Sequence, residues 1–311
     1  MLTRYRYTDH EPGFEVCPEE EKAQWINLED PTKDEIEWIH SELGVPMLFL
    51  TDPLDPKERP RLDQEDNCDL MIITVPYLDD KRDDIDFDVA PLGFVLRGEV
   101  LITICGEVGL IGDLLSRSHK KPKPINPKKT LLKILIESSV DYITHLELME
   151  RLTDSLEFSL SKSQQNREIM TLLTIEKALV VYTVALKSNR AIITKVMEGK
   201  HFFQNEDDLD LVDHALIENQ QGIYMADIFG QIIGSVGDAF GNIISNNLNK
   251  VMKFLTGVTI ILMLPTLVVG AYGMNVWLPL ANHSKAFWII TFLCLIVSGL
   301  VWLYFIRKRW I

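Results

Sequence analysis

The chain has 311 residues, a length typical of about two domains, and a net charge of −14 at pH 7. The segment from Lys250 to Ile311 contains six Lys or Arg and no Asp or Glu, so the excess of acidic residues lies in the rest of the chain. An acidic body without a basic stripe cannot neutralise phosphates, which argues against nucleic acid as a partner. The acidity is compatible with attracting cations, or simply with keeping the protein soluble.

Several classes of activity lack their motifs. There is no phosphate-binding G-x-x-x-x-G-K-[ST] loop, no H-E-x-x-H and no nucleophile elbow, so we expect neither an enzyme nor an ATP-driven pump. The cysteines stand singly, which predicts reduced residues in a cytosolic compartment for Cys17, Cys68, Cys105 and Cys294. The first residues lack the apolar core of a signal peptide, so the soluble part is expected in the cytoplasm.

Residues 1–125 are predicted to form a mixed α/β domain. Residues 25–28 have the composition of a short strand, and residues 70–75 form an apolar, β-branched run of the same kind. Residues 94–96 and 100–104, joined through Arg-Gly-Glu, predict a hairpin.

A helix is predicted after the first strand. Asp30 is expected to cap it with Pro31 in the first turn, and Gly44 is expected to end it. Its apolar spacing predicts a buried face formed by Ile36, Trp38, Ile39 and Leu43. The charged segment 81–88 is expected to be a turn or an edge loop.

Residues 126–249 are predicted to form a helical stalk, which follows a basic, proline-rich linker at residues 119–129. Apolar residues at three- and four-residue spacing in 130–199 indicate a long antiparallel helix pair. A third helix is expected to begin at Glu206 and, if unbroken to Tyr272, to reach about 100 Å at 1.5 Å per residue. A helix of this length needs partners along it, which predicts an oligomer.

Residues 250–311 are predicted to form a membrane domain with two spans. The spans 251–272 and 286–306 can each cross the roughly 30 Å core of a bilayer, and the loop 273–285 joins them before a basic tail at 307–311. By the positive-inside rule, the cytoplasmic face carries Lys250, Lys253, Arg307, Lys308 and Arg309. We therefore expect an integral protein of the cytoplasmic (inner) membrane, surrounded by lipid, with both termini in the cytoplasm.

One face of the third helix is polar or small even where it is predicted to cross the membrane. Alternating steps of four and three residues from Asp238 reach Asn242, Ser245, Asn249, Met252, Thr256, Thr259, Met263, Thr266 and Gly270, here termed the polar seam. This is the spacing along which a helix packs against copies of itself. Because polar side chains are costly toward lipid, the seam predicts either a water-filled pore or hydrogen bonds that hold helices together.

Four glycines recur at helical spacing beside the start of the polar seam, at Gly230, Gly234, Gly237 and Gly241. Each costs about 1 kcal/mol relative to Ala in a helix interior, so the stripe requires an explanation. Close approach of neighbouring helices is one interpretation. A bending point that lets the lower pore widen or collapse is the other.

The sequence Tyr272-Gly273-Met274-Asn275 ends the first span. Together with the upstream run NKVMKFLT, the Met-Leu-Pro-Thr of residues 263–266 and the final basic cluster, it resembles the signature of the CorA family of magnesium channels. The resemblance covers the layout of the whole chain, although the N-terminal half is similar mainly in type.

The resemblance implies a funnel-shaped homopentamer with an α/β cytoplasmic domain, long stalk helices and a two-helix C-terminal transmembrane hairpin. It implies a selectivity entrance formed by Gly273, Met274 and Asn275. It also implies a pore lined by Asp238, Asn249, Met263 and Thr266. A hydrophobic constriction is implied at Met252 and Leu255. The implied cargo is Mg²⁺, with Co²⁺ and Ni²⁺ as further cations, and no organic cofactor is implied.

Neutral carboxamides suit a channel for hydrated magnesium. Mg²⁺ exchanges its waters reluctantly, so a channel selects it best while it is hydrated. The Asn275 oxygens can accept hydrogen bonds from those waters without removing them, and Asp238 is expected to act on the ion through water as well. Backbone carbonyls around Gly270 and Gly273 can do the same.

The family resemblance also implies that cytosolic Mg²⁺, bound between neighbouring subunits, holds the channel shut. Acidic residues that could bind it are Asp83, Asp84, Asp86, Asp88, Asp207, Asp208, Asp210 and Asp213. The sequence does not pair these residues with one another, and a solvated charged face is the alternative for each.

The outer loop departs from the family pattern. Many CorA proteins carry a glutamate there, whereas this loop reads VWLPLANHSK and contains Lys285 but no acid. We therefore expect weaker capture of cations at the mouth, and a proton-coupled zinc transporter of the same superfamily is an alternative. A membrane-anchored oligomeric sensor or scaffold is a second alternative, which predicts that the polar seam tolerates leucine.

Overall fold

The structure is a computed structural model and describes residues 1–8, 13–18, 22–79, 86–116, 126–162, 166–199, 203, 205–276, 278–279, 284–308 and 310. The chain divides into two compact units, an N-terminal unit, Met1–Gly234, and a C-terminal unit, Ser235–Ile311. The predicted limits of the cytoplasmic and membrane parts, after residues 125 and 249, stay predictions.

The N-terminal unit is built on a seven-stranded sheet. The strands are β1 (Leu2–Thr8), β2 (Gly13–Val16), β3 (Trp25–Glu29), β4 (Arg61–Glu65), β5 (Cys68–Asp79), β6 (Asp86–Arg97) and β7 (Val100–Cys105). Their order is β2-β1-β3-β7-β6-β5-β4, and all neighbours pair antiparallel except β3 and β7, which pair parallel. The predicted strands in β3 and β5 and the predicted β6–β7 hairpin are confirmed.

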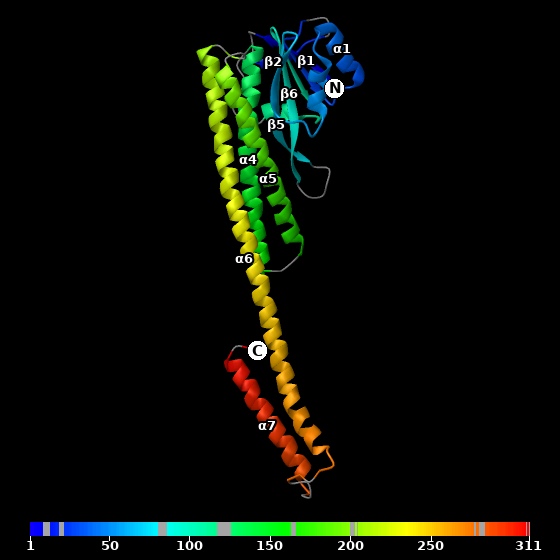
Figure 1. Ribbon diagram of the computed structural model, residues 1–311, viewed down its shortest axis with the longest axis vertical. Helices are drawn as coiled ribbons and strands as arrows, with labels where there is room; N and C mark the ends of the chain where they lie inside the picture. The colour runs from blue at the N-terminus through cyan, green and yellow to red at the C-terminus, as the bar shows by residue number, and fades with distance from the viewer. Residues whose placement is uncertain are drawn as a thin grey trace. The chain divides into compact units, whose positions relative to one another are not determined.

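Helices cover both faces of this sheet (Figure 1). They are α1 (Lys33–Leu43), α2 (Met47–Thr51), the 3₁₀ turn η1 (Asp52–Leu54), α3 (Leu110–Ser116), α4 (Pro127–Lys162), α5 (Asn166–Gly199) and the start of α6 (Glu206–Tyr272). Side chains alternate across β5: Met71 and Ile73 join the core with α3 to α6, whereas Leu70 and Ile72 join the core with α1 and α2. Burial on both faces explains the nearly continuous apolar sequence of this strand.

The N-cap of the first helix lies two residues later than predicted. Its N-cap is Thr32, whose hydroxyl accepts a hydrogen bond from the Glu35 backbone N–H at 3.3 Å, while the Glu35 carboxylate accepts one from the Thr32 N–H at 2.8 Å. The prediction of Asp30 as cap was wrong, because this reciprocal capping box satisfies two free N–H groups and Asp30 instead adopts φ 40° in the turn before it. Gly44 ends the helix in the left-handed conformation, as predicted.

The buried face of α1 is narrower than predicted. Ile36 and Ile39 are buried, and Leu43 packs partly against the same core. Trp38 was placed on this face wrongly: it is exposed, with the Arg4 guanidinium 4.4 Å from the centre of its ring. Positions 36, 39 and 43 follow the helical repeat, and position 38 falls off their line. The ring then gains a cation–π contact instead of burial.

A charged segment was predicted as a loop over residues 81–88. Residues 80–85 lie outside the described residues, but residues 86–88 belong to β6 and pair with Tyr77 to Asp79 of β5. Their assignment to a loop was wrong, because Phe87 is buried and anchors the strand between two aspartates. The predicted linker 119–129 lies outside the described residues up to residue 125. Its last three residues, 127–129, form the first turn of α4, so their assignment to the linker was wrong.

The long antiparallel helix pair is confirmed by α4 and α5, and a buried hydrogen-bond network joins it to the sheet. The first residue of β4, Arg61, pairs with Ile72, so β4 does not extend far enough to pair with the backbone of Thr74. The side chain of Asn189 on α5 accepts from the Thr74 N–H at 2.9 Å and donates to its carbonyl at 2.6 Å. Tyr142 on α4 donates to the same carbonyl at 3.1 Å. Two helices thus satisfy backbone groups that would otherwise be buried without partners.

The C-terminal unit contains the rest of α6, which continues unbroken to Tyr272 as predicted, and α7 (Ala286–Arg307). The two helices pack side by side around a small cavity of about 70 Å³, which Pro265, Cys294 and Val297 help to line. Beyond the end of α6, the Tyr272 hydroxyl donates to the carbonyl of Pro279 in the connecting loop, at 3.1 Å.

Three helices are long and apolar enough to cross a membrane, judged by length and composition: α5 from Glu168, α6 and α7. The first of these was not predicted as a span. In α5, Ile193 and Val196 are buried in the core beneath the sheet, whereas α7 buries only Cys294 and Phe305 among its described residues. This difference supports α6 and α7 as the two predicted spans.

Candidate functional site

The turn at Gly273-Met274-Asn275 continues from the last turn of α6. The Gly273 N–H donates to the carbonyls of Val269 at 3.0 Å and Gly270 at 3.2 Å, and the Met274 N–H donates to Ala271 at 3.2 Å. A Cβ on Gly273 would lie 3.4 Å from the Gly270 oxygen, which is tight but not forbidden. The helix therefore ends in a compact turn of backbone hydrogen bonds.

Asn275 is exposed at the tip of this turn. Among the described residues, its carboxamide makes no hydrogen bond. It therefore keeps an acceptor oxygen and two N–H donors available for solvent or for the water shell of an ion. Met274 is exposed as well, with 60% of its surface accessible.

The polar seam is exposed throughout in the single chain, from Asp238 to Gly270. In the C-terminal unit α7 packs on another face of α6, along residues such as Leu264 and Val268. The seam therefore has no partner within the described part of one chain. The apolar members of the seam are exposed as well: Met252 and Met263 expose 52% and 65% of their surface.

Two seam threonines show how their hydroxyls are oriented. Thr259 donates its hydroxyl hydrogen to the Leu255 carbonyl at 2.8 Å, and Thr266 donates to Leu262 at 2.9 Å. Because each hydroxyl has one hydrogen and two lone pairs, its remaining capacity is that of an acceptor. An acceptor oxygen suits the outward-pointing hydrogens of a hydrated cation.

The three- and four-residue spacing of the polar seam continues further upstream than predicted. The same steps of three and four, followed back from Asp238 through Ser235, reach Gln231, Ile228, Tyr224, Gln221 and Ile217, all of which are exposed. Three of them are large apolar or aromatic side chains with more than half of their surface accessible. The signal was present in the sequence, because the periodicity does not begin at Asp238. In the N-terminal unit α6 thus exposes an apolar stripe of Ile217, Tyr224 and Ile228, away from the face that packs on α4 and α5.

The remaining predicted residues fall into three groups. The predicted constriction residue Leu255 is exposed, as are the basic residues Lys250, Lys253, Arg307 and Lys308, whereas Arg309 lies outside the described residues. A Cβ added to Gly234, Gly237 or Gly241 would meet no atom within 4 Å, and at Gly230 only Leu179 at 3.6 Å. Close packing among the described residues of one chain therefore does not explain the stripe, and the two interpretations, close approach of neighbouring helices and a bending point, stay predictions.

Among the described residues, the acidic candidates form no metal-binding group. Asp207, Asp210 and Asp213 are exposed near the start of α6, and Asp88 is exposed on β6. Asp208 is buried, and its Oδ1 has no hydrogen-bond partner among the described residues. Nothing is described of the Asp86 side chain, and Asp83 and Asp84 lie outside the described residues. Within the described residues, no three His, Cys, Asp or Glu side chains form a group that could hold a metal ion.

Comparisons with known proteins decide the family. The family model described as "CorA-like Mg2+ transporter protein" matches residues 20–308. The chain belongs to this family. It is 26% identical over 305 residues to the cobalt/magnesium transport protein CorA of Methanocaldococcus jannaschii, covering 96% of this chain and 94% of the relative. It is 21% identical to the CorA protein of Thermotoga maritima, covering 92% of this chain and 83% of the relative.

The fold agrees with a solved structure of full length. The complete structure of the CorA magnesium transporter from Methanocaldococcus jannaschii matches with a TM-score of 0.82 at 23% identity, covering 100% of this chain and 99% of the other. The predicted α/β domain with long helices is thus confirmed as a CorA-like fold. The CorA relatives are named as transport proteins, which agrees with the prediction that this chain is not an enzyme.

Proposed function

We propose that this protein is a channel that imports hydrated Mg²⁺ across the cytoplasmic membrane. The observation that carries the proposal is the polar seam of α6, which is exposed along its whole length and leads to the Gly273-Met274-Asn275 turn in a member of the CorA-like family. A seam of oxygen-bearing side chains on an otherwise apolar helix is costly unless it faces water. In an assembly in which the seams of several chains face one another around a central path, the seam lines a pore.

The chemistry of the seam matches an ion that keeps its waters. Mg²⁺ dehydrates reluctantly, and the seam offers neutral acceptors: the amide of Asn249 and the hydroxyls of Thr259 and Thr266. The amide of Asn275 adds another in the turn beyond it. These groups accept hydrogen bonds from coordinated water at little cost. Asp238 is the single carboxylate of the seam, and it attracts the cation through water. Co²⁺ and Ni²⁺ have similar hydration and are expected to pass as well.

The proposed pore requires several chains. A single α6 helix encloses nothing, and its seam and the upstream stripe of Ile217, Tyr224 and Ile228 are both exposed in one chain. We propose a homopentamer, as the family resemblance implies. In it, Gly273 to Asn275 form the selectivity entrance, and Met252 with Leu255 form a constriction that closes by expelling water. Mg²⁺ bound on the cytosolic side between neighbouring subunits would favour the closed state.

The decisive experiment is Mg²⁺ uptake into proteoliposomes by the full chain and two variants. Asn275→Ala removes one ring of carboxamides, and we expect uptake to fall at least about tenfold, because hydrogen bonds to charged groups contribute about 1.5–3 kcal/mol each. Asn246→Ala is the matched control, since Asn246 is an exposed amide on the same helix but off the seam. Equal loss in both variants would contradict the assignment of the entrance.

The same vesicles separate the competing functions. Mg²⁺ and Co²⁺ are compared with Zn²⁺, with and without a proton gradient. Uptake of Zn²⁺ that rises with the gradient and exceeds Mg²⁺ uptake would replace the magnesium channel by a proton-coupled zinc transporter; the acid-free outer loop is the feature that favours this alternative. Absence of flux for every cation, together with tolerance of Asn249→Leu, would favour a membrane-anchored scaffold.

A further inference from the structure

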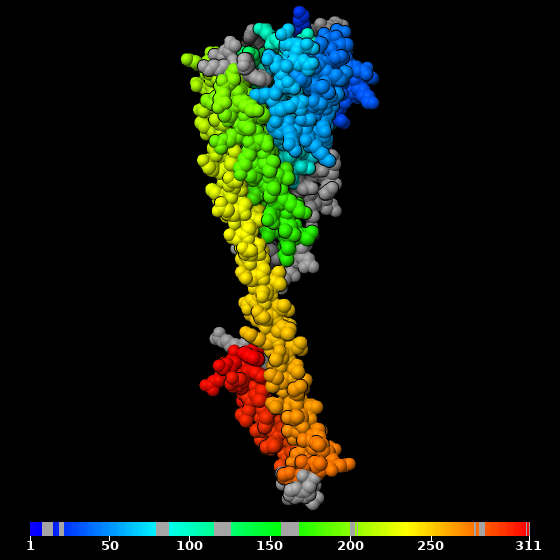
Figure 2. Space-filling model, in the orientation of Figure 1, coloured from blue at the N-terminus to red at the C-terminus, as the bar shows by residue number. Residues whose placement is uncertain are grey.

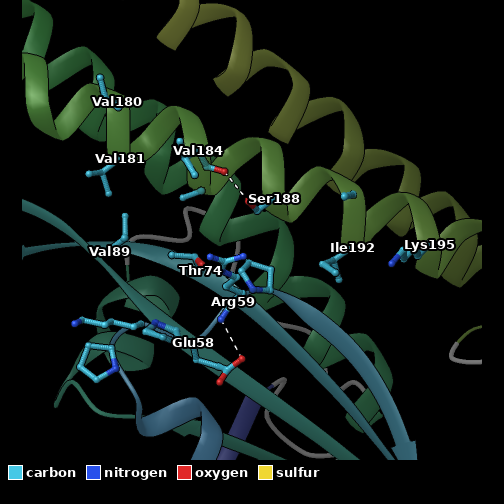
Figure 3. A pocket seen from close by; sticks show the side chains of 16 residues that line it. Glu58, Arg59, Thr74, Val89, Val180, Val181, Val184, Ser188, Ile192 and Lys195 are labelled. Atoms are coloured by element: carbon cyan, nitrogen blue, oxygen red, sulfur yellow. Dashed lines mark hydrogen bonds between the residues drawn. The ribbon is translucent and has the colours of Figure 1, made fainter.

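A groove opens on the N-terminal unit where α5 meets the sheet. Its volume is about 650 Å³, within the usual range for sites that bind small molecules. Figure 3 shows its two sides: Val181, Val184 and Ser188 project from α5, and Thr74, Val89 and Arg59 lie across from them. In Figure 2 the surface of α5, in green, adjoins that of the blue segment near residues 50–75. The groove lies wholly within this unit and uses no residue of the polar seam.

The walls of the groove are aliphatic. Val180 and Val184 each expose 60% of their surface and Val181 exposes 40%, although they lie on a helix whose other face is buried in the core. Ala185 and Ile192 continue the apolar wall. A contiguous apolar surface facing water on a soluble unit usually marks a binding site. None of the described residues that line the groove is aromatic, so it offers no ring on which a nucleobase could stack.

The rim of the groove is cationic, in a chain whose net charge is −14. Lys57, Arg59 and Lys195 line it and are exposed, and among the described residues none of their side chains forms an ion pair. The one acidic residue of the rim, Glu58, is already engaged: it forms an ion pair with Arg61 and accepts from the Arg59 backbone N–H at 3.0 Å. The free charge of the rim is therefore positive.

The segment that carries two of these cations is held in place. Pro56 and Pro60 flank it, and Asp55 accepts from the Lys57 N–H at 2.9 Å. Arg61 binds both Asp52 and Glu58. Burial acts to lower the pKa of Arg61, but these two carboxylates raise it on balance, so the guanidinium stays charged. The backbone that carries Lys57 and Arg59 is therefore preorganised and does not have to be ordered when an anion binds.

We propose that this groove binds an aliphatic anion, a carboxylate or phosphate carried on an unbranched or branched hydrocarbon body. The hydrocarbon would lie along Val181 and Val184, and the anionic group would bind Lys57 and Arg59. Lys195 contributes less, because it also borders a second cavity of about 270 Å³ whose lining includes Asp63 and Asp69. The proposal does not depend on the transport function.

The test is calorimetric titration of the full-length protein in nanodiscs of zwitterionic lipid, with empty nanodiscs as blank. Octanoate and octyl phosphate are the probes, and the tighter one identifies the anionic group. We expect saturable binding that falls at least about tenfold in Lys57→Gln/Arg59→Gln, because two charge-assisted hydrogen bonds are lost. Arg190→Gln is the matched control: Arg190 is an exposed α5 cation outside the groove, and its loss should change the affinity by less than about twofold.

Further arms test the two halves of the proposal separately. Octanol carries the same chain without charge, and inorganic phosphate carries charge without the chain; neither should compete with octanoate. Val184→Trp fills the groove and should abolish binding while leaving the thermal unfolding midpoint near that of the parent protein. The proposal is overturned by octanol binding as tightly as octanoate, by equal binding in the double variant and Arg190→Gln, or by no heat above the blank.

Discussion

Helix α5 and the C-terminal pair of α6 and α7 are all apolar enough to cross a membrane, yet they use their apolar residues differently. In α5, 39% of the most apolar 18-residue window is buried within the chain, against 6% in α6 and 11% in α7. The α5 side chains enter a core beneath the sheet, and Asn189 also hydrogen bonds to Thr74 there. Composition alone therefore does not separate a core helix from a membrane helix; the partner surface does.

The largest expected effect tests the core role of α5. Ile193→Ala removes a side chain with no accessible surface, and truncation of this kind typically costs about 2–5 kcal/mol. Ile296→Ala, on α7, is the matched control, because Ile296 is 44% exposed in the single chain. We expect a marked drop in the thermal unfolding midpoint of the full-length protein, followed by circular dichroism at one scan rate, only for the first variant. Equal drops would mean that α7 is packed as tightly as α5.

A charged substitution should have the larger effect in α7 and the smaller effect in α5, which is the reverse of the two truncations. Leu295→Asp places a carboxylate near the middle of α7, where insertion scales assign a cost of about 2.5–3.5 kcal/mol. Met170→Asp places the same group on α5 at a residue that is 62% exposed, where surface substitutions stay within about 0.5 kcal/mol. The measurement is the fraction of protein that stays with membranes after alkaline extraction. If both variants remain fully inserted, α7 does not face lipid at this position.

The long helices could be predicted from the sequence, because a repeat near 3.6 residues sustained over more than 20 residues leaves little ambiguity. Their details were decided by local geometry. Asp30 and Thr32 are both good caps, and only the reciprocal hydrogen bonds with Glu35 select Thr32. The strand β1 was not predicted, because its sequence LTRYRYT alternates arginines with half-buried side chains and lacks an apolar run.

The polar seam and the groove beside α5 also differ in how far the sequence could locate them. The polar seam was predictable, because its period of three and four residues lies within one continuous helix. The groove beside α5 was not, because Arg59 and Val184 are more than 100 residues apart and meet only through the fold. Among the described residues, three of the four glycines of the stripe have no neighbour that a Cβ would meet, so packing within one chain does not reveal its role, and close approach of helices and bending stay the two predictions.

A smaller effect distinguishes the seam from the rest of the C-terminal unit. Thr266 on α6 and Thr291 on α7 are both exposed and both donate to the carbonyl four residues earlier, at 2.9 and 2.8 Å. Thr→Val keeps the shape and replaces the hydroxyl by a methyl; the hydrogen bond to the backbone carbonyl is lost in both variants, so the difference between them reports on the outward acceptor lone pairs. We expect Thr266→Val to lower Mg²⁺ uptake by about fivefold, as for loss of one hydrogen bond of about 1 kcal/mol, and Thr291→Val to leave it unchanged. Equal uptake in both would place Thr266 outside the conducting path.

The smallest effect is a pH dependence confined to the core of the N-terminal unit. Burial, helped by the charge of Glu29, raises the pKa of the Cys105 thiol from 9.0 to about 12. Above pH 9 the unfolded chain releases this proton while the folded chain keeps it, so the stability linked to the neutral thiol is lost as the pH rises from 9 to 12. Cys105→Ala lacks this contribution, so its melting temperature should fall less steeply with pH than that of the parent protein. At pH 10 the lost contribution to the free energy of unfolding is on the order of 1 kcal/mol. A constant gap between parent and Cys105→Ala from pH 8 to 11 would show that the thiol ionises equally in both states, and the cavity left by the sulfur would then be the whole effect.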